Sequence, residues 1–335
     1  MFQPNKRLSA LSSASALLLA ISTVASCAAL NPGQAQSTST STQSTSTSTS
    51  EPASSSASPS PTATAEAPTL CGPGSAINFD KTTFQGLPTI DNKWFPLKPG
   101  SRYTTTGTVV ADDSTTEREV THTVTGLTKV IDGVKTLVMW DRDYEDGSLV
   151  ESELAFFAQD KAGAVWLFGE YPEEFENDKF MGAPNTFIHG ISGSQAGIAM
   201  QAAPQTGTPE YVQAHAPSVG FLDCAAAFDK NVALCVPTGC YGDVLVINER
   251  NPLEPAVGHQ RKFYSAGTGL VKVTAEGGVR QETLDLVKVE QLSDAQLAEV
   301  NAEALKLDQH GYEVSKEVYA NTARAEVATT TSGGK

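Results

Sequence analysis

The stretch from Val134 to Gly169, VKTLVMWDRDYEDGSLVESELAFFAQDKAGAVWLFG, decides the fold class. It contains three runs rich in β-branched and aromatic residues, at 134–144, 149–159 and 164–169. The links between them, Glu145–Ser148 and Asp160–Gly163, are short and contain Asp and Gly. Such links are typical of β-hairpins, whereas parallel strands need a long crossover connection. The stretch therefore predicts an antiparallel meander and not a series of βαβ units.

Strand patterns continue on both sides of this meander. The further runs lie at 103–110, 118–125, 243–248, 259–265, 270–275 and 282–291. Between them, 171–218 is rich in Pro and Gly, which predicts a long irregular excursion with at most short strands such as 210–213. We therefore expect a mainly β protein with one large antiparallel domain over 69–291, built as a curved sheet or half-barrel.

A helical tail is predicted over 292–335. Ser293 and Gln296 form a capping box, and apolar residues then recur at helical spacing on one face, at Leu297, Val300, Ala304 and Leu307. Gly311 is a plausible stop for this helix, and a second short helix is predicted over 314–321.

The N-terminus has the pattern of an export signal. Lys6 and Arg7 precede an apolar stretch that is too short and too rich in Ser to span a bilayer, so 1–26 reads as a signal peptide. Val24-Ala25-Ser26-Cys27 resembles the lipobox of bacterial lipoproteins, which implies that Cys27 carries acyl chains such as palmitate. Cleavage near Ala35 with an incidental cysteine is the alternative. The prediction is a lipid-anchored protein on the extracytoplasmic face of a bacterial membrane.

The segment that follows Cys27 is a predicted tether. Residues 37–50 are Ser or Thr at every position except Gln43, and the composition stays rich in Ser, Thr, Ala and Pro through Pro68. Such a segment cannot bury a core, so 27–68 is expected to be disordered. Of the 335 residues, 335 − 68 = 267 then remain for a folded body, enough for a substantial core. The formal net charge of −15 argues against a nucleic-acid partner.

Four cysteines remain in the body: Cys71, Cys224, Cys235 and Cys240. An even number in an exported domain predicts disulfides, and four cysteines allow three connectivities. If 220–228 and 232–236 form a hairpin around Asp229-Lys230, Cys224 and Cys235 face each other, which leaves Cys71 for Cys240. Their spacing contains no CxxC motif and therefore gives little support for a zinc site.

The catalytic and metal patterns of this chain are weak. Gly190–Ser194 lacks the final Gly of a nucleophile elbow, so a flexible loop is favoured. Asp141, Asp143, Glu145 and Asp146 imitate a calcium loop but lack its Gly and its Glu, and exposed carboxylates running into a turn explain them equally. A second acidic run, Glu170–Asp178, is expected to be a solvated loop. His122 and His259 are expected to be surface or paired strand residues, and His189 or His215 would serve a hydrolase.

Aromatic residues on the strands are the better candidates for a site. Trp140, Phe157, Trp166 and Tyr264 are predicted to face a hydrophobic small molecule on the concave side of the sheet, with packing in the core as the alternative. No catalytic residue, metal ligand or cofactor is predicted. The favoured function is a non-catalytic ligand-binding or carrier module, and the alternatives are an extracytoplasmic, metal-assisted hydrolase and a structural cell-envelope protein.

Three stretches carry a family resemblance: Trp94–Tyr103, Phe157–Glu170 and Asn251–Val271. They resemble a group of uncharacterised bacterial secreted proteins and lipoproteins, over about residues 90–290. The last stretch is also similar to turns of LolA-like periplasmic proteins, which implies a curved half-barrel. The group carries no established activity, and the helical tail and the four body cysteines depart from its pattern.

Overall fold

The computed structural model describes residues 70–328 except 85, 87 and 113. The signal predicted for 1–26, the lipidation site Cys27 and the tether over 27–68 lie outside the described residues. In the part that is described, no helix combines the length and the apolar character needed to cross a membrane.

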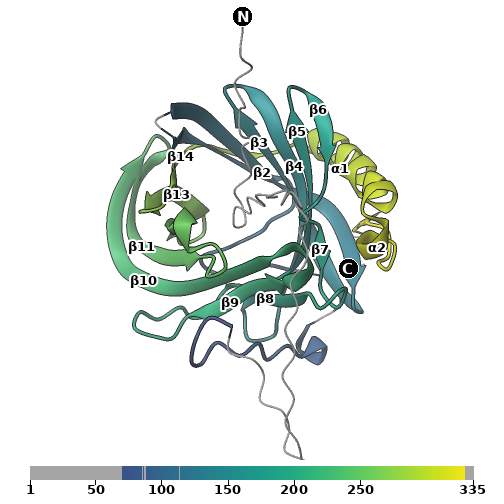
Figure 1. Cartoon of the computed structure of the whole chain (residues 1–335), viewed down its shortest axis with the longest axis horizontal. Helices are drawn as coiled ribbons and strands as arrows, with labels where there is room; N and C mark the ends of the chain where they lie inside the picture. Colours follow the sequence, from purple (N-terminus) through teal and green to yellow (C-terminus); the bar gives the residue numbers. More distant parts are fainter. Residues whose placement is uncertain (1–69, 85, 87, 113, 329–335) are drawn as a thin grey trace, which may run out of the picture. The chain divides into compact units, whose positions relative to one another are not determined.

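The chain forms an antiparallel β structure followed by two helices (Figure 1). The strands are β1 (Ser101–Ala111), β2 (Ser114–Ile131), β3 (Val134–Glu145), β4 (Ser148–Gln159), β5 (Val165–Glu176), β6 (Lys179–Gly182), β7 (Phe187–Ile188), β8 (Gln195–Met200), β9 (Tyr211–Ala216), β10 (Phe221–Val236), β11 (Gly239–Arg250), β12 (His259–Ser265), β13 (Gly269–Glu276), β14 (Arg280–Gln291) and β15 (Glu326–Val327). The helices are α1 (Asp294–Val314) and α2 (Lys316–Tyr319), with short 3-10 turns at Lys81–Thr83, Pro217–Val219 and Pro255–Val257.

Twelve strands close into a barrel in the order β1-β14-β13-β12-β11-β10-β9-β8-β5-β4-β3-β2. The ring closes because β1 pairs on both sides: Thr104 lies opposite Thr121 of β2 and opposite Lys288 of β14. The prediction of a mainly antiparallel β domain is confirmed, but the curved sheet or half-barrel is wrong. Closure pairs both edges that an open sheet would leave exposed.

The hairpins of the opening stretch are present. Glu145 pairs with Ser148, and Asp146 and Gly147 between them have positive φ angles of 47° and 77°. Both central residues of a type I′ hairpin turn need positive φ, which explains the Asp-Gly pair at this position. The strands on either side of it, β3 and β4, stay paired as far as Leu137 and Phe157.

Two segments differ from the prediction. The expected irregular excursion over 171–218 contains the end of β5 and all of β6, β7, β8 and β9. The expected hairpin around Asp229-Lys230 is a single strand, β10, whose pairing with β11 shifts register near Asp229. Asp229 and Lys230, the expected turn, lie at this irregularity, and the next residue, Asn231, has a φ of 61°.

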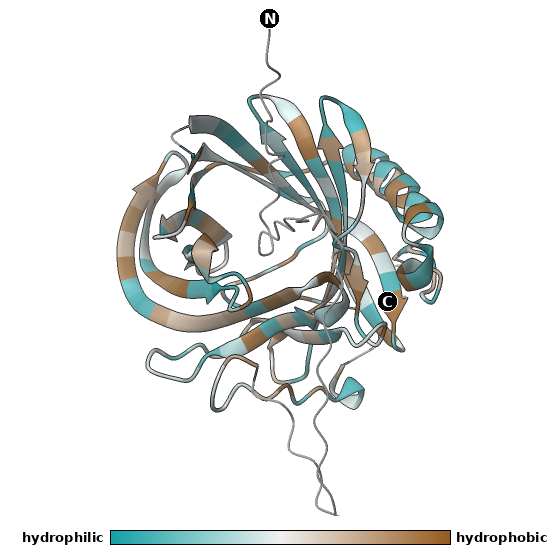
Figure 2. Cartoon of the chain, viewed as in Figure 1, coloured by the Kyte–Doolittle hydropathy of each residue, from teal (hydrophilic) through white to brown (hydrophobic). Residues whose placement is uncertain are grey.

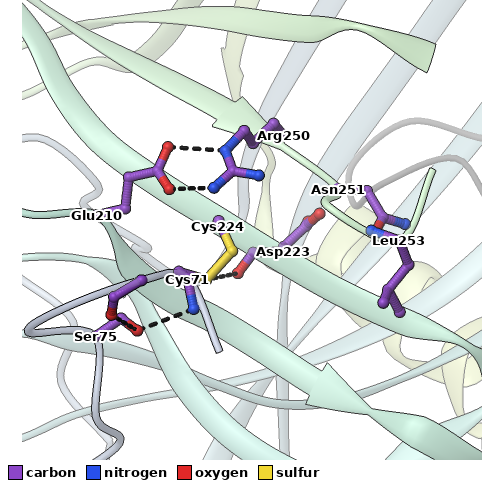
Figure 3. Close-up of a disulfide and its surroundings, with 9 residues drawn as sticks. Cys71, Ser75, Glu210, Asp223, Cys224, Arg250, Asn251 and Leu253 are labelled. Carbon is purple, nitrogen blue, oxygen red and sulfur yellow. Dashed lines mark hydrogen bonds and ion pairs between the residues drawn. A yellow bond between two sulfur atoms is a disulfide. The ribbon is translucent and has the colours of Figure 1, made fainter. Parts of the chain in front are cut away.

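The cysteines form two disulfides, but with a different pairing from the predicted one. Cys71 is bonded to Cys224, and Cys235 is bonded to Cys240. Because β10 does not turn back on itself, Cys224 and Cys235 lie on one strand and cannot face each other. The first disulfide, shown in Figure 3, joins the start of the described chain to β10, and the second closes the β10–β11 hairpin, where Cys235 lies opposite Cys240.

The C-terminal helices pack against the outer face of the barrel wall (Figure 1). The capping box of Ser293 with Gln296 is present. The helix continues past Gly311, which is not the stop: a Cβ there would lie 2.6 Å from the ring of Tyr319, so Gly311 allows α2 to fold back on α1. Lys129 of β2 fixes this layer through Asp308, with Nζ and Oδ1 2.8 Å apart.

Strand alternation divides the apolar residues into two layers, visible as alternating colours along the strands in Figure 2. One layer fills the barrel and includes Leu137 and Phe157. The other lies outside the wall beneath the helices and includes Val138 and Phe156. The sheet is therefore buried on both faces where the helices cover it.

Residues 88–100, here called the plug, close one end of the barrel. Trp94 and Leu97 are each 5 % exposed and belong to the inner layer. Asn92 fixes the plug, because its amide donates to the carbonyls of Gly163 at 2.8 Å and Gln201 at 3.1 Å. The opposite end, here called the mouth, is formed by the β1–β2, β3–β4 and β13–β14 turns and by the loop at 251–258.

Candidate ligand site in the barrel lumen

A cavity of about 100 Å³ lies inside the barrel between the plug and the mouth. Its apolar side is formed by Phe95 of the plug and by inward side chains of the wall, including Met139, Phe157, Tyr264 and Leu270. A cavity of roughly 150 Å³ is known to hold benzene, so this space suits a small molecule or a slim chain.

The polar side of the cavity is formed by charged residues on the same strands. His122, Asp141, Glu153, Glu249 and Lys262 all line it. On β3 and β4 the change from apolar to acidic follows strict alternation: Met139 precedes Asp141, and Glu153 precedes Ala155 on the inward face. Asp141 and Glu153 are direct cross-strand partners, which brings their carboxyl groups side by side.

The cationic groups of the lining have carboxylate partners. Lys262 Nζ lies 2.6 Å from Glu249 Oε2, and the amide of Gln213 also donates to Glu249, at 3.1 Å. His122 Nδ1 lies 3.0 Å from Asp141 Oδ1. These contacts offset the cost of burying the charges.

Burial and charge shift the pKa values of this layer. Burial lowers the pKa of Lys262, but the carboxylates of Glu249, Asp223 and Glu282 together outweigh it and the net shift is upward. His122 behaves in the same way: burial opposes the imidazolium, but Asp141 raises its pKa overall. Burial raises the pKa of Asp141 despite the nearby His122.

Glu153 has the most distinctive environment. It is 3 % exposed, and its Oε1 has no hydrogen-bond partner among the described residues. Burial and then the carboxylates of Glu170 and Glu151 raise the pKa of Glu153 well above its ordinary value. Burial and the neighbouring Asp143 likewise raise the pKa of Glu151. A carboxyl group with these neighbours favours either its neutral form or a nearby cation.

A denser ionic layer lies between the cavity and the mouth. The fully buried guanidinium of Arg118 contacts three carboxylates: Asp143 at 2.6 Å, Glu145 at 2.8 Å and Glu282 at 3.4 Å. Arg280 also contacts Glu145, at 2.6 Å. Buried arginine paired with several carboxylates fixes this end of the lumen.

A second hollow, of about 50 Å³, lies beside the cavity at the mouth. Four residues line both spaces: Asp223, Glu249, Gln260 and Glu282. The remaining lining of the second hollow comes from Arg250, His259, Arg280 and the loop at 251–258. The polar side of the lumen therefore continues toward the mouth.

The predicted aromatic residues separate into two groups. Phe157 and Tyr264 line the cavity. Trp140 and Trp166 lie on the outward face, where their indole N–H groups donate at 2.9 Å to Ser152 Oγ and Asp160 Oδ2 respectively. Trp166 also packs against Phe79, with ring centroids 5.8 Å apart. The structure thus brings two of the four residues together in the lumen.

Contrary to the expected exposure, each of the two acidic runs is exposed only toward its turn, at Asp146 and Asp178, and its strand residues are buried or half-buried. Asp141 and Asp143 are each 1 % exposed and point into the barrel. Glu170 and Glu173 are buried on β5, and Glu173 accepts from the hydroxyl of Tyr171 at 2.6 Å. Glu173 lies on the outer face beneath α1, where His310 Nδ1 is 2.6 Å from its Oε1, so the second run is buried by the helix layer as well as by strand pairing.

The histidines proposed for a hydrolase lie apart from the cavity. His189 packs on the outer side against Phe79 and Phe168, and its Nδ1 accepts from the backbone N–H of Ala196. His215 is half-buried at the end of β9. Within the described ranges, no cluster of three or more His, Cys, Asp or Glu residues could hold a metal ion.

Comparison with known proteins gives two distant structural similarities. No family model and no curated protein matches the chain. A Bacteroides fragilis protein described as exported, with a YmcC-like fold, is 12 % identical over 59 % of this chain and 99 % of that one, with a TM-score of 0.35. A Parabacteroides distasonis protein described as a lipoprotein is 13 % identical over 62 % of this chain and 100 % of that one, with a TM-score of 0.30.

With TM-scores of this size, neither structure indicates a function for this chain. The similarity to LolA-like proteins that the Asn251–Val271 stretch suggests stays a prediction.

Proposed function

We propose that this chain is a lipid-anchored extracytoplasmic bacterial protein whose barrel lumen binds a small amphipathic molecule without transforming it. The observation that carries the proposal is the cavity itself, which has aromatic and aliphatic side chains on the plug side and charged groups on the mouth side. Binding sites of small molecules combine a mostly apolar lining with a few placed polar groups, and barrels are frequent hosts for them.

The two sides of the cavity suggest how such a molecule would be oriented. Its apolar part would lie against Phe157, Met139 and Leu270, where burial of apolar surface favours binding. Its polar part would lie beside Asp141 and Glu153, in reach of the second hollow toward the mouth. The plug closes the apolar end, so we expect the ligand to enter from the mouth.

The location rests on other features. The lipobox that ends at Cys27 and the Ser/Thr-rich tether predict export and attachment to a membrane. Two disulfides within the described residues suit an oxidising compartment. A tether of roughly 40 residues spans about 35 Å on average, so it would hold the barrel away from the bilayer surface.

The test is native mass spectrometry of the full chain, expressed with its export signal and released from detergent micelles in the instrument. We expect a small organic molecule bound in stoichiometric amount, which solvent extraction would then identify. The same protein refolded from guanidinium chloride in ligand-free buffer serves as the control. An exported protein with only the apo mass under gentle conditions would contradict the proposal.

A further inference from the structure

Two buried acceptor oxygens at the polar side of the cavity lack a hydrogen-bond partner among the described residues: Glu153 Oε1 and Asp141 Oδ2. Both residues line the cavity and are almost fully buried, at 3 % and 1 % exposure. Buried polar groups are nearly always paired, so unpaired acceptors that face a cavity indicate a missing donor. Their position as cross-strand partners on β3 and β4 places the two carboxyl groups close enough to share one donor group.

The charge of the lining indicates which kind of donor fits. Five carboxyl groups line the cavity, on Asp141, Glu153, Asp223, Glu249 and Glu282, against the two cationic side chains of His122 and Lys262. Both cationic groups already contact carboxylates, Lys262 at 2.6 Å and His122 at 3.0 Å. Arg118 contacts Glu282 from the ionic layer, which still leaves more carboxyl groups than cations around the cavity. An anionic ligand would therefore meet excess negative charge, whereas a cationic donor would meet the acceptors of Glu153 and Asp141.

The apolar boundary sets the remainder of the ligand. Met139 and Ala155 are the next residues along the inward face of β3 and β4. The apolar side of the cavity therefore begins directly beside the two carboxyl groups. The rings of Phe157 and Tyr264 also line this space, and an aromatic face attracts a cation as well as an alkyl chain. A slim alkyl chain ending in N–H donors matches both sides of a cavity of about 100 Å³.

Accepting the lumen as a ligand site, we infer that its ligand is a primary alkylammonium compound, with the ammonium group between Glu153 and Asp141 and the alkyl part toward Phe157. The ammonium group supplies three N–H donors and one positive charge. Charge-assisted hydrogen bonds of this kind are the strong ones in a buried site.

The test compares three probes of one chain length: protonated n-hexylamine, hexan-1-ol and hexanoate. Isothermal titration calorimetry would use the full-length exported protein after refolding from guanidinium chloride in ligand-free buffer, in detergent micelles, with protein-free micelles as the blank. Glu153→Gln keeps the size of the side chain but removes its charge. Glu119→Gln removes the same formal charge from an exposed position on β2 and is the matched control.

We expect hexylammonium to bind the unaltered protein more tightly than hexanol, and hexanoate to bind most weakly. Glu153→Gln should weaken hexylammonium about 10- to 100-fold, the effect of losing one charge-assisted hydrogen bond. It should leave hexanol binding unchanged, which also shows that the variant folds. Glu119→Gln should change neither.

Two outcomes would overturn the inference, and they differ in what they leave standing. If hexanol or hexanoate binds as tightly as hexylammonium, or if Glu153→Gln affects all probes equally, the ammonium assignment fails while the lumen stays a ligand site. If no probe binds the unaltered protein, the proposed function fails, and the ammonium assignment fails with it.

Discussion

The two halves of the lumen are built by the same strands with opposite chemistry. Toward the plug, Trp94, Leu97 and Phe157 fill the barrel with apolar side chains. Toward the mouth, the guanidinium of Arg118 contacts three carboxylates and is as deeply buried as the apolar side chains near the plug. The first half is stabilised by removing apolar surface from water and the second by pairing its charges. The cavity lies where the two meet, beside acceptors of Glu153 and Asp141 that lack a hydrogen-bond partner among the described residues.

The largest expected effect is on the mouth side, for Arg118→Met. Removing the guanidinium leaves Asp143, Glu145 and Glu282 without this shared cationic partner, which should lower the free energy of unfolding by about 3–5 kcal/mol. Chemical denaturation measures the change. Lys81→Met breaks an exposed ion pair with Asp132 and should cost less than about 1 kcal/mol. Equal costs for both variants would show that the ionic layer does not hold the mouth.

On the plug side, Trp94→Ala should lower the free energy of unfolding by about 3 kcal/mol. Trp94 is 5 % exposed, and its removal leaves a void in the inner layer. The value is at the lower end for a buried tryptophan because the plug lies outside the strands of the barrel and can readjust. Lys98→Ala, on an exposed residue of the same segment, is the control for denaturant unfolding. A Trp94→Ala variant as stable as Lys98→Ala would mean that residues 88–100 do not act as a plug.

The two disulfides are expected to stabilise the fold by different amounts. Cys71–Cys224 joins residues 153 positions apart, whereas Cys235–Cys240 joins residues 5 apart in a hairpin that is already paired. If chain entropy dominates, replacing the first pair by serine should cost about 2–3 kcal/mol more than replacing the second. Thermal or urea unfolding of the two double variants measures this difference. Equal losses would assign the stabilisation to local packing instead.

The smallest expected effect is a change in pH dependence at the boundary. Burial, with Glu170 and Glu151 nearby, raises the pKa of Glu153 well above its ordinary value of 4.5. The folded protein therefore holds this proton more tightly than the unfolded chain, and Glu153 makes the free energy of unfolding fall as pH rises from about 4.5 through the raised pKa.

Glu153→Gln removes this contribution, so its stability relative to the unaltered protein should increase with pH over the same window. Urea unfolding at a series of pH values measures the difference, with Glu119→Gln as the exposed control. A difference that is flat, or that falls as pH rises, would contradict the raised pKa.

The strands could be predicted from local pattern, but their closure could not. The Asp-Gly turn after Glu145 and the capping box at Ser293 are local signals, and both are present in the structure. The pairing of β1 with β14 joins distant parts of the chain, and no local pattern encodes it. The predicted cysteine pairing was wrong for a related reason. Residues near Asp229 form a register shift within β10 and not the expected turn.

The charged half of the lumen is visible in the sequence as alternation of apolar and acidic residues on two strands. Met139, Asp141 and Asp143 alternate on β3, so one inward face changes from apolar to acidic along its length. Glu151, Glu153 and Ala155 repeat this on β4. The usual expectation that carboxylates face water assigned these residues to the surface. Arg118, the partner of Asp143 and Glu145, lies on the neighbouring strand β2, and its third carboxylate, Glu282, lies on β14. Only the closed barrel brings β14 close enough to complete this ionic layer.

Filling the cavity with a larger side chain tests whether the lumen binds a small molecule. Ala155 lines it and is 1 % exposed, and Ala155→Phe would place a ring in the space between the apolar and acidic layers. Native mass spectrometry of the exported variant beside the unaltered protein is the measurement, with circular dichroism to confirm that both are folded. We expect a bound small molecule in the unaltered protein and its loss in the folded variant. The same molecule retained by Ala155→Phe, or absent from both proteins, would contradict a ligand site in the lumen.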